Sequence, residues 1–429
     1  MRQLTLIAIR PLLRPALLLA AAGLATLSGQ ALAAEALGPI EFGRFSVFLQ
    51  AIAILATVAV FGYDNALVRH ISTARGENRS GAVANLVAAA NSATLPISVG
   101  VAVAACAGFL LIEDFGLSLA LILSLAVAIP ATVRMRITSA RLRALGGANL
   151  AIAVERLVRD APLFIVCVAF IAISTELRLG AAQAAIAVIC GIAGGLYMAQ
   201  LRAPARSRRG DHQVPAEFHG SARRFTAFAI ADALFQRIDI FVVSMVLSER
   251  FAGLLGIALI IAGLCGFGAI LSVYIYVPRI GAAFSAGRPG EAERLLRSSA
   301  FVAMAATLSV LVLWAGYTTL LSDFALREYA EAEDVVALMI AAQLINATTG
   351  STGPALGVIG FERDLVKVYV GAVIFRVVLT VALIDIFGFV GIGFSLVLCY
   401  AVVNAGLGFV LWHRARLLPG IFSLLRARP

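Results

Sequence analysis

Residues 37–72 read LGPIEFGRFSVFLQAIAILATVAVFGYDNALVRHIS, and this stretch holds the features that decide the fold. Most of it is one apolar run, long enough for a membrane-spanning helix, which needs about 20 apolar residues. An aspartate, Asp64, lies inside this run, and an arginine, Arg69, follows where the run ends. Charges inside a span are costly, so Asp64 needs either a partner or contact with water.

The composition extends this pattern to the whole chain. Of its 429 residues, 61% are hydrophobic and only 14% are charged, whereas a soluble protein has about 25% charged residues. The mean hydropathy is +0.97. These values predict an all-α membrane protein with about twelve transmembrane helices. The predicted spans are 13–36, 45–68, 82–112, 115–133, 150–174, 180–200, 224–247, 252–277, 299–321, 335–358, 366–387 and 390–412.

The basic residues indicate the orientation, because cytoplasmic loops are rich in Lys and Arg. With a cytoplasmic N-terminus, the cytoplasmic segments hold 26 of the 34 Lys and Arg residues, and the opposite face holds four. We therefore expect a multi-pass protein of the cell inner membrane with both termini cytoplasmic. The net charge of +10 then describes a basic face beside anionic lipid, and no nucleic-acid partner is needed to explain it. QALAAE at 30–35 could be a signal-peptide cleavage site, but we interpret the first apolar run as a retained span.

The longest hydrophilic break, at 202–224, lies near the middle of the chain. It predicts two lobes of six helices each, an N-lobe at 1–212 and a C-lobe at 213–429. A shift of 210 residues aligns the second and eighth spans without gaps, although the identity is low. Two halves of six spans have the same orientation, so a pseudo-symmetric pair with a binding site between its halves is expected.

Several charged side chains fall inside predicted spans. Asp232, Gln236 and Asp239 follow i, i+4, i+7 spacing and share one helical face, which favours either a water-filled groove or pairing between helices. Arg376 lies near the middle of the eleventh span. Its counter-charge is either a ligand such as a pyrophosphate or a structural partner such as Asp239 or Asp64. Asp64 is either a proton or cation site or one half of an ion pair between helices.

The tenth span, AAQLINATTGSTGPALG at 341–357, is the richest in amides and hydroxyls. Gln343, Asn346 and Thr349 belong to it. Such groups bind sugars, and they also join packed helices, so both roles stay open.

Motifs of the common enzyme classes are absent from the sequence. It contains no GxxxxGK[ST] phosphate loop, no HExxH and no GxSxG. The five cysteines lie in apolar runs and the four histidines lack ligand spacing, so no metal site and no disulfide framework are predicted. The sequence therefore favours a protein that is not an enzyme, has no cofactor, and draws on an H⁺ or Na⁺ gradient or on consumption of its product.

Residues 37–72 resemble the first loop and second span of bacterial polysaccharide biosynthesis proteins. These are O-antigen-type flippases of the multidrug/oligosaccharidyl-lipid/polysaccharide (MOP) exporter superfamily, with a MATE-like fold. The resemblance rests on a G-P-x-x-[FY]-G loop and a span ending G-x-D-x-A-[LI]-x-[RK]. Here these motifs are Gly38, Pro39, Phe42 and Gly43, then Gly62, Asp64, Ala66, Leu67 and Arg69. The segments 237–239 and 326–346 are also similar to the family's seventh and tenth spans.

The resemblance implies two six-helix lobes around a central cavity, alternating access, and a substrate of sugars on a polyprenyl pyrophosphate. We therefore expect a flippase that moves this lipid-linked oligosaccharide to the periplasmic leaflet for surface polysaccharide synthesis. Substrate contacts are expected at Arg376, Arg237, Gln343, Asn346 and Thr349, and ion coupling at Asp64, Asp239 and Asp232. The expected partners are this substrate, membrane lipids, and a polysaccharide polymerase or export complex, with the chain itself a monomer.

Three other functions are open to the sequence. A cation-coupled multidrug exporter of the same fold predicts an acid-dominated cavity. A polysaccharide polymerase or ligase predicts a long periplasmic loop with basic residues, and the sequence has no such loop. A membrane scaffold predicts intramembrane charges that only pair with one another.

Overall fold

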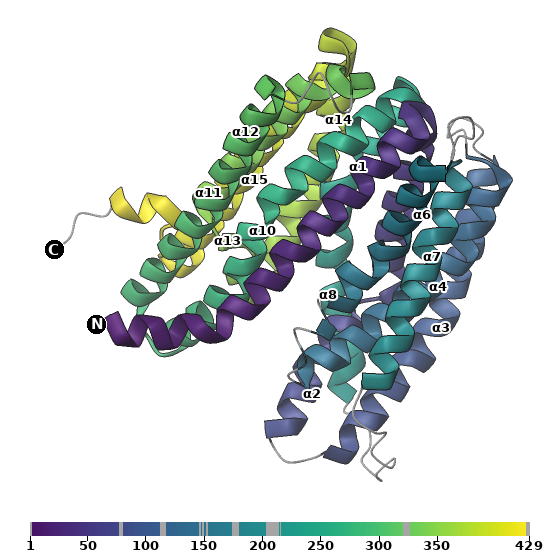
Figure 1. The fold of residues 1–429 in the computed structure, drawn as a ribbon. Coiled ribbons are helices and arrows are strands. Elements are labelled where there is room, and N and C mark those ends of the chain that lie inside the picture. The colour runs from purple at the N-terminus through teal and green to yellow at the C-terminus, as the bar shows by residue number, and fades with distance from the viewer. Residues whose placement is uncertain are drawn as a thin grey trace. The chain divides into compact units, whose positions relative to one another are not determined.

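The computed structural model consists of helices joined by short turns within the described residues, which are 2–76, 80–111, 117–145, 147, 150–151, 153–173, 180–202, 214, 216–320 and 327–425. Long helices dominate it (Figure 1). The all-α part of the predicted fold class is confirmed by these helices.

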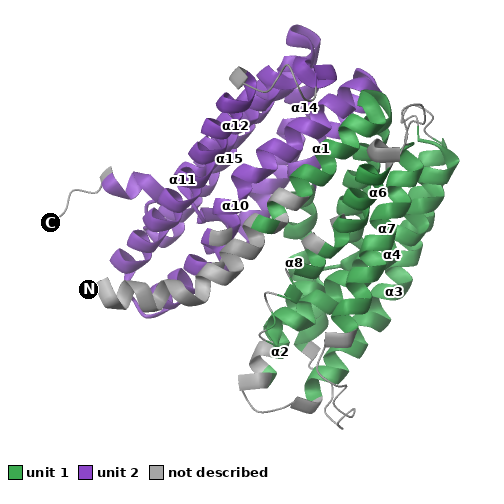
Figure 2. Cartoon of the chain, in the orientation of Figure 1, with its two compact units in different colours: residues 1–233 green, residues 234–429 purple. Residues whose placement is uncertain are grey.

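The chain divides into two compact units, Met1–Ala233 and Leu234–Pro429 (Figure 2). This division lies inside one helix, some twenty residues after the boundary predicted at 212/213. The helices that begin in the first unit are α1 (Arg2–Val60), α2 (Tyr63–Gly76), α3 (Ser80–Leu111), α4 (Leu119–Ala144), η2 (Ala153–Val158), α6 (Arg159–Ile173), α7 (Ala181–Arg202) and α8 (Ala216–Arg237). Within this unit α4 packs against α3 and α7, and α1 packs against α6.

In the second unit, α10 packs on α11, and α15 packs between α12 and α14. Short helices connect or continue the long ones. The elements are α9 (Asp239–Val246), α10 (Glu249–Ser285), α11 (Pro289–Leu320), η3 (Arg327–Ala332), α12 (Glu333–Thr349), α13 (Thr352–Val358), α14 (Glu362–Phe387), η4 (Gly388–Val390), α15 (Gly391–Val410), η5 (Leu411–Ala415) and η6 (Gly420–Leu425).

By length and composition, seven stretches of helix among the described residues are long and apolar enough to cross a membrane. Eight qualify if the bent pair Arg327–Thr349 and Thr352–Val358 is one span. The twelve predicted spans divide the same helices more finely. Two of them, 366–387 and 390–412, fall in the single stretch Glu362–Ala415, and the span at 150–174 corresponds to η2 and the short α6.

The first two predicted spans also differ from the structure. The loop expected between them is helical, and α1 runs through it with only Gly38 in a non-helical conformation. The second span does not continue to 68, because the helix breaks at Phe61 and Gly62 and restarts as α2. Gly62 has φ +69°, and a Cβ there would lie 2.2 Å from the carbonyl oxygen of Ala222 in α8. Only glycine fits this backbone conformation and this close approach.

A similar break separates α12 from α13 in the second unit. Gly350 ends α12 with φ +62°, and a Cβ there would lie 2.5 Å from the hydroxyl oxygen of Ser299 in α11. The Ser299 hydroxyl also accepts a hydrogen bond from the backbone N–H of Ser351, at 3.0 Å. The bend at the tenth predicted span is therefore held by a specific contact, and it places the amide-rich α12 against α15.

Candidate functional site

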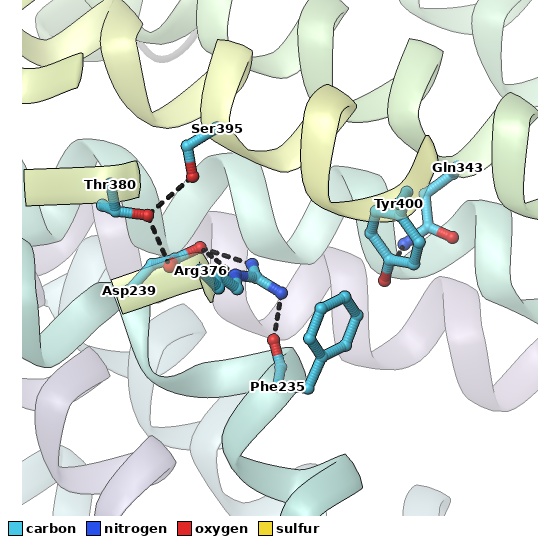
Figure 3. Close-up of polar contacts among 7 residues, drawn as sticks. All are labelled: Phe235, Asp239, Gln343, Arg376, Thr380, Ser395 and Tyr400. Atoms are coloured by element: carbon cyan, nitrogen blue, oxygen red, sulfur yellow. Dashed lines mark hydrogen bonds and ion pairs between the residues drawn. The ribbon is translucent and has the colours of Figure 1, made fainter. Parts of the chain in front are cut away.

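The buried polar centre of the second unit joins α9 to α14 through one ion pair. Asp239 is the first residue of α9, and Arg376 lies at the middle of α14. The guanidinium Nε donates to both carboxylate oxygens, at 3.0 and 3.1 Å, and Nη2 donates to Oδ2 as well (Figure 3). Both residues are only 1% exposed. Two charges enclosed this completely are stable only because each neutralises the other.

Neighbouring groups satisfy the remaining polar atoms of the pair. Nη1 of Arg376 donates to the carbonyl oxygen of Phe235 at the end of α8, and the guanidinium carbon lies 4.8 Å from the centre of the Phe235 ring. Thr380 donates to Oδ1 of Asp239 at 3.4 Å and shares a 2.6 Å hydrogen bond with Ser395 of α15 (Figure 3). This shell fixes the orientation of both charged groups.

The structural partner that the sequence left open for Arg376 is thus Asp239. In this conformation neither group faces water, so a substrate phosphate or a coupling ion would reach them only after α9 or α14 moves. Their roles as a substrate contact and an ion-coupling site stay predictions.

A second group of polar side chains lies where α12 packs on α15. Gln343 Nε2 donates to the Tyr400 hydroxyl at 3.3 Å (Figure 3). Asn404 donates to the side-chain oxygen of Asn346 at 3.3 Å and accepts a hydrogen bond from the Thr349 hydroxyl. Gln343 and Asn346 are half-buried, whereas Thr349 is 3% exposed. The three predicted residues of the tenth span therefore belong to one hydrogen-bonded group.

Sequence reasoning missed Tyr400 and Asn404, which complete this group from α15. They are spaced i, i+4 in the apolar stretch LCYAVVNAG, and that spacing places them on one helical face. An aromatic contact links the group to the ion pair, since the ring of Phe235 meets the edge of Tyr400 with 5.3 Å between ring centres. Tyr369 of α14 makes the same kind of contact with Phe235, at 5.8 Å.

Asp232 and Arg237 are the other predicted residues of the seventh span. Asp232 and Arg237 are half-buried in α8, and each makes polar or charged interactions of its own. A single-residue turn at Ile238 separates α8 from α9, which begins at Asp239, and Ile238 itself keeps helical dihedral angles. The predicted roles of Asp232 in ion coupling and of Arg237 in substrate contact stay predictions.

Asp64 lies in the first unit and is 4% exposed. One oxygen accepts a hydrogen bond from Nη2 of Arg136 in α4, at 2.8 Å, and the other accepts from the backbone N–H of Asn65, at 2.8 Å. Arg136 Nη1 also donates to the Thr57 hydroxyl in α1, at 2.8 Å. Asp64 occupies the first turn of α2, where the helix dipole favours a negative charge. An ion pair between helices therefore accounts for the burial of this carboxylate.

No group of three or more His, Cys, Asp or Glu side chains suited to a metal ion occurs among the described residues. All five cysteines are free thiols.

Comparisons with solved structures assign the fold. The inward-facing conformation of a multidrug resistance MATE family transporter of the MOP superfamily matches with a TM-score of 0.68 and 17% identity, covering 96% of this chain and 100% of that one. The outward-facing conformation of a transporter so described matches with a TM-score of 0.67 and 16% identity, covering 98% and 97%. The MATE multidrug transporter DinF-BH, solved as a complex with a ligand, matches with a TM-score of 0.70 and 15% identity, covering 95% of each chain.

Sequence comparisons add no closer relative, since no family model and no curated protein matches this chain. The similarity to the solved transporters extends over nearly the full length of both chains at low identity. The chain has the fold of the MATE transporters of the MOP superfamily.

Proposed function

We propose that this protein is a flippase of the inner membrane that moves a polyprenyl-pyrophosphate-linked oligosaccharide from the cytoplasmic to the periplasmic leaflet. Three observations support the proposal: the MATE fold, the resemblance of residues 37–72 to polysaccharide flippases, and the state of the buried acids. The last of these carries the proposal, because it favours an anionic or uncharged substrate over a cationic drug.

Among the residues that the structure describes, each of the two buried aspartates has an arginine as its counter-ion. Asp239 is paired with Arg376, and Asp64 is paired with Arg136. A binding site for a cationic drug needs carboxylates that can accept the charge of the drug, and a carboxylate paired with arginine cannot do so without losing its partner. Arginine-neutralised acids are compatible with an anionic or uncharged ligand, which is the charge character of a glycan on a pyrophosphate.

The polar group of α12 and α15 suits the sugar part of such a substrate. Its amides, hydroxyls and tyrosine ring are the groups that hydrogen-bond and stack on sugars, and Gln343 and Asn346 remain partly accessible. In the proposed cycle Gln343, Asn346, Thr349, Tyr400 and Asn404 exchange their mutual hydrogen bonds for sugar hydroxyls. Arg376 and Arg237 contribute when the transport cycle exposes them.

The energy source in this proposal is a gradient of H⁺ or Na⁺, or consumption of the product in the periplasm, with Asp64, Asp239 and Asp232 as candidate coupling residues. The second candidate function is a cation-coupled multidrug exporter. One observation favours it: solved transporters with this fold are described as multidrug transporters.

Complementation of a bacterial strain that lacks its surface-glycan flippase tests the proposal. The wild-type gene should restore surface polymer, and Arg376→Ala and Asp239→Asn should each reduce it at equal protein levels. Asp385→Asn is a matched control, because Asp385 is an exposed acid on the same helix as Arg376. The exporter would be favoured if the wild type fails to restore polymer in strains with several different glycans and makes the cells that express it resistant to cationic dyes.

A further inference from the structure

The contact between α2 and α8 in the first unit brings together basic side chains that the proposed function does not use. The backbones touch here, since Gly62 approaches the carbonyl of Ala222 too closely for any larger residue. Phe218 is completely buried and packs against the rings of Tyr63 and His70, with ring centres 5.6 and 5.4 Å apart. The two helices therefore hold their polar side chains in fixed positions.

A shared hydroxyl connects two of these side chains. Nε2 of His70 lies 3.2 Å from the hydroxyl oxygen of Ser221, which is 1% exposed. Nη2 of Arg224 donates to the same oxygen, also at 3.2 Å. A serine hydroxyl has one hydrogen to donate. The oxygen also has two acceptor positions, of which Arg224 uses one. Nε2 can therefore accept from the hydroxyl in the neutral imidazole or donate to it in the protonated one.

Positive charge surrounds this imidazole. Burial, together with the charges of Arg69 and Arg224, lowers the pKa of His70 below its ordinary value of 6.5, and Glu217 opposes the shift. Arg223, next to Arg224, places a further positive charge near Tyr63 in the same contact. All three arginines have exposed side chains. The acids on these parts of α2 and α8 are Glu217 and Asp64, and Asp64 is paired with Arg136. The arginines therefore outnumber the acids, and a ligand from solution can reach them.

We propose that Arg69, His70 and Arg224 bind an anion of the phosphate class, together with a proton on His70. The planar guanidinium groups match the oxygens of phosphate, which accept several hydrogen bonds at once. A bound anion neutralises the charges that disfavour protonation, and a protonated imidazole supplies one more N–H donor. Anion and proton therefore strengthen each other's binding, as linkage requires. The anion is either a soluble phosphate or the headgroup of a lipid. The site lies outside the Asp239–Arg376 group and does not depend on the flippase function.

Histidine-selective NMR on the full-length protein in phosphatidylcholine nanodiscs tests the proposal. The chain has four histidines, and the signal that disappears in His70→Asn belongs to His70. Sulfate is the probe, because its charge stays constant over the titration. Saturating sulfate should raise the pKa of His70 by about one pH unit, which corresponds to sulfate binding about tenfold more tightly to the protonated protein.

Two variants and two further ligands decide the outcome. Arg224→Gln should lose the effect of sulfate, whereas Arg294→Gln, which removes an exposed arginine from α11, should retain it. An unfolding curve like that of the wild type shows for each variant that the first unit, which contains this site, is intact. Inorganic pyrophosphate and nanodiscs containing phosphatidylglycerol then separate a soluble ligand from a lipid headgroup. No sulfate effect in the wild type, an equal effect in Arg224→Gln, or no effect of either phosphate source would overturn the proposal.

Discussion

The guanidinium of Arg376 lies against the carboxylate of Asp239, with Nε 3.0 Å from Oδ1, and the two residues are each 1% exposed. They are separated by 137 positions in the sequence, and their pairing joins α14 to α9. Removing only one member of such a pair is costly in a membrane protein, because the other member is left as a buried charge without a partner.

Removal of either partner alone should therefore strongly destabilise the second unit. Arg376→Met and Asp239→Asn should each lower the free energy of unfolding by about 3–5 kcal/mol. The double variant should lose much less than the sum of the two, because it leaves no uncompensated charge. Reversible unfolding in mixed detergent and SDS micelles measures all three values. Strictly additive losses would show that the two side chains do not act as a pair.

An exposed ion pair of the same unit provides the comparison. Arg250 and Glu331 form two parallel hydrogen bonds, both at 2.9 Å, but their side chains are 41% and 56% exposed. Exposed pairs contribute little, because water screens them in the folded state. Arg250→Met should leave the unfolding curve nearly unchanged in the same assay, and a loss as large as that of Arg376→Met would contradict the role given to burial.

The ion pair of Asp64 should be intermediate in strength. Asp64 is buried, but the side chain of Arg136 is 28% exposed, so water stabilises an unpaired arginine in part. We expect Asp64→Asn to lower the free energy of unfolding by about 1–2 kcal/mol. Arg136→Gln should cost more than Asp64→Asn, because it leaves the carboxylate buried without its cation. A larger loss in the free energy of unfolding for Asp64→Asn than for Arg136→Gln would contradict the burial of Asp64 beside the partly exposed Arg136.

Gly62 should not tolerate a side chain. Gly62→Ala places a methyl group 2.2 Å from the carbonyl of Ala222 at φ +69°, which should cost more than about 2 kcal/mol. Gly220→Ala is the matched control in α8, because a Cβ there meets nothing within 4 Å, and it should stabilise the helix by about 0.5–1 kcal/mol. Size-exclusion chromatography of samples heated to a series of temperatures gives the melting temperature of each of the two variants. Equal behaviour would rule out the close contact of Gly62 with α8.

Folding stability should depend on pH through His70. Its pKa is lowered in the folded protein, by burial first and by the neighbouring arginines next. The unfolded chain therefore binds the proton more readily, and stability should fall as pH decreases below about 6.5 toward the folded-state pKa. In phosphate-free and sulfate-free buffer, His70→Asn should flatten this decrease, whereas His413→Asn should not. A decrease that is identical in wild type and His70→Asn would exclude this contribution.

Most helices could be predicted from the sequence because long apolar runs leave few alternatives in a membrane. The partners of the buried charges could not be assigned in the same way. For Arg376 the sequence offered Asp239 or Asp64 as a structural partner, and only the packing of α9 against α14 distinguishes them. The predicted fourth span ends at 133 and leaves Arg136 in a loop, whereas α4 continues to Ala144 through four arginines.

The α15 half of the polar group was also missed. Tyr400 and Asn404 stand in the most apolar part of the C-terminal region, and the i, i+4 spacing of two polar residues there was the only signal. By contrast, Gln343, Asn346 and Thr349 were found because many amides and hydroxyls in one span are unusual. Single polar residues in an apolar helix acquire a meaning only when their neighbours across the helix interface are known.

The most direct test of the central claim is the transbilayer movement of a lipid-linked oligosaccharide in proteoliposomes that contain the purified protein. A glycosidase added outside the vesicles reports how much of the substrate has reached the outer leaflet. We predict that the substrate of the inner leaflet is cleaved faster than in protein-free vesicles. Cleavage should be slower with Asn404→Leu or Arg376→Met than with the wild type. The vesicles should not accumulate a cationic dye. Dye transport driven by an ion gradient, with lipid movement no faster than in empty vesicles, would contradict the flippase function.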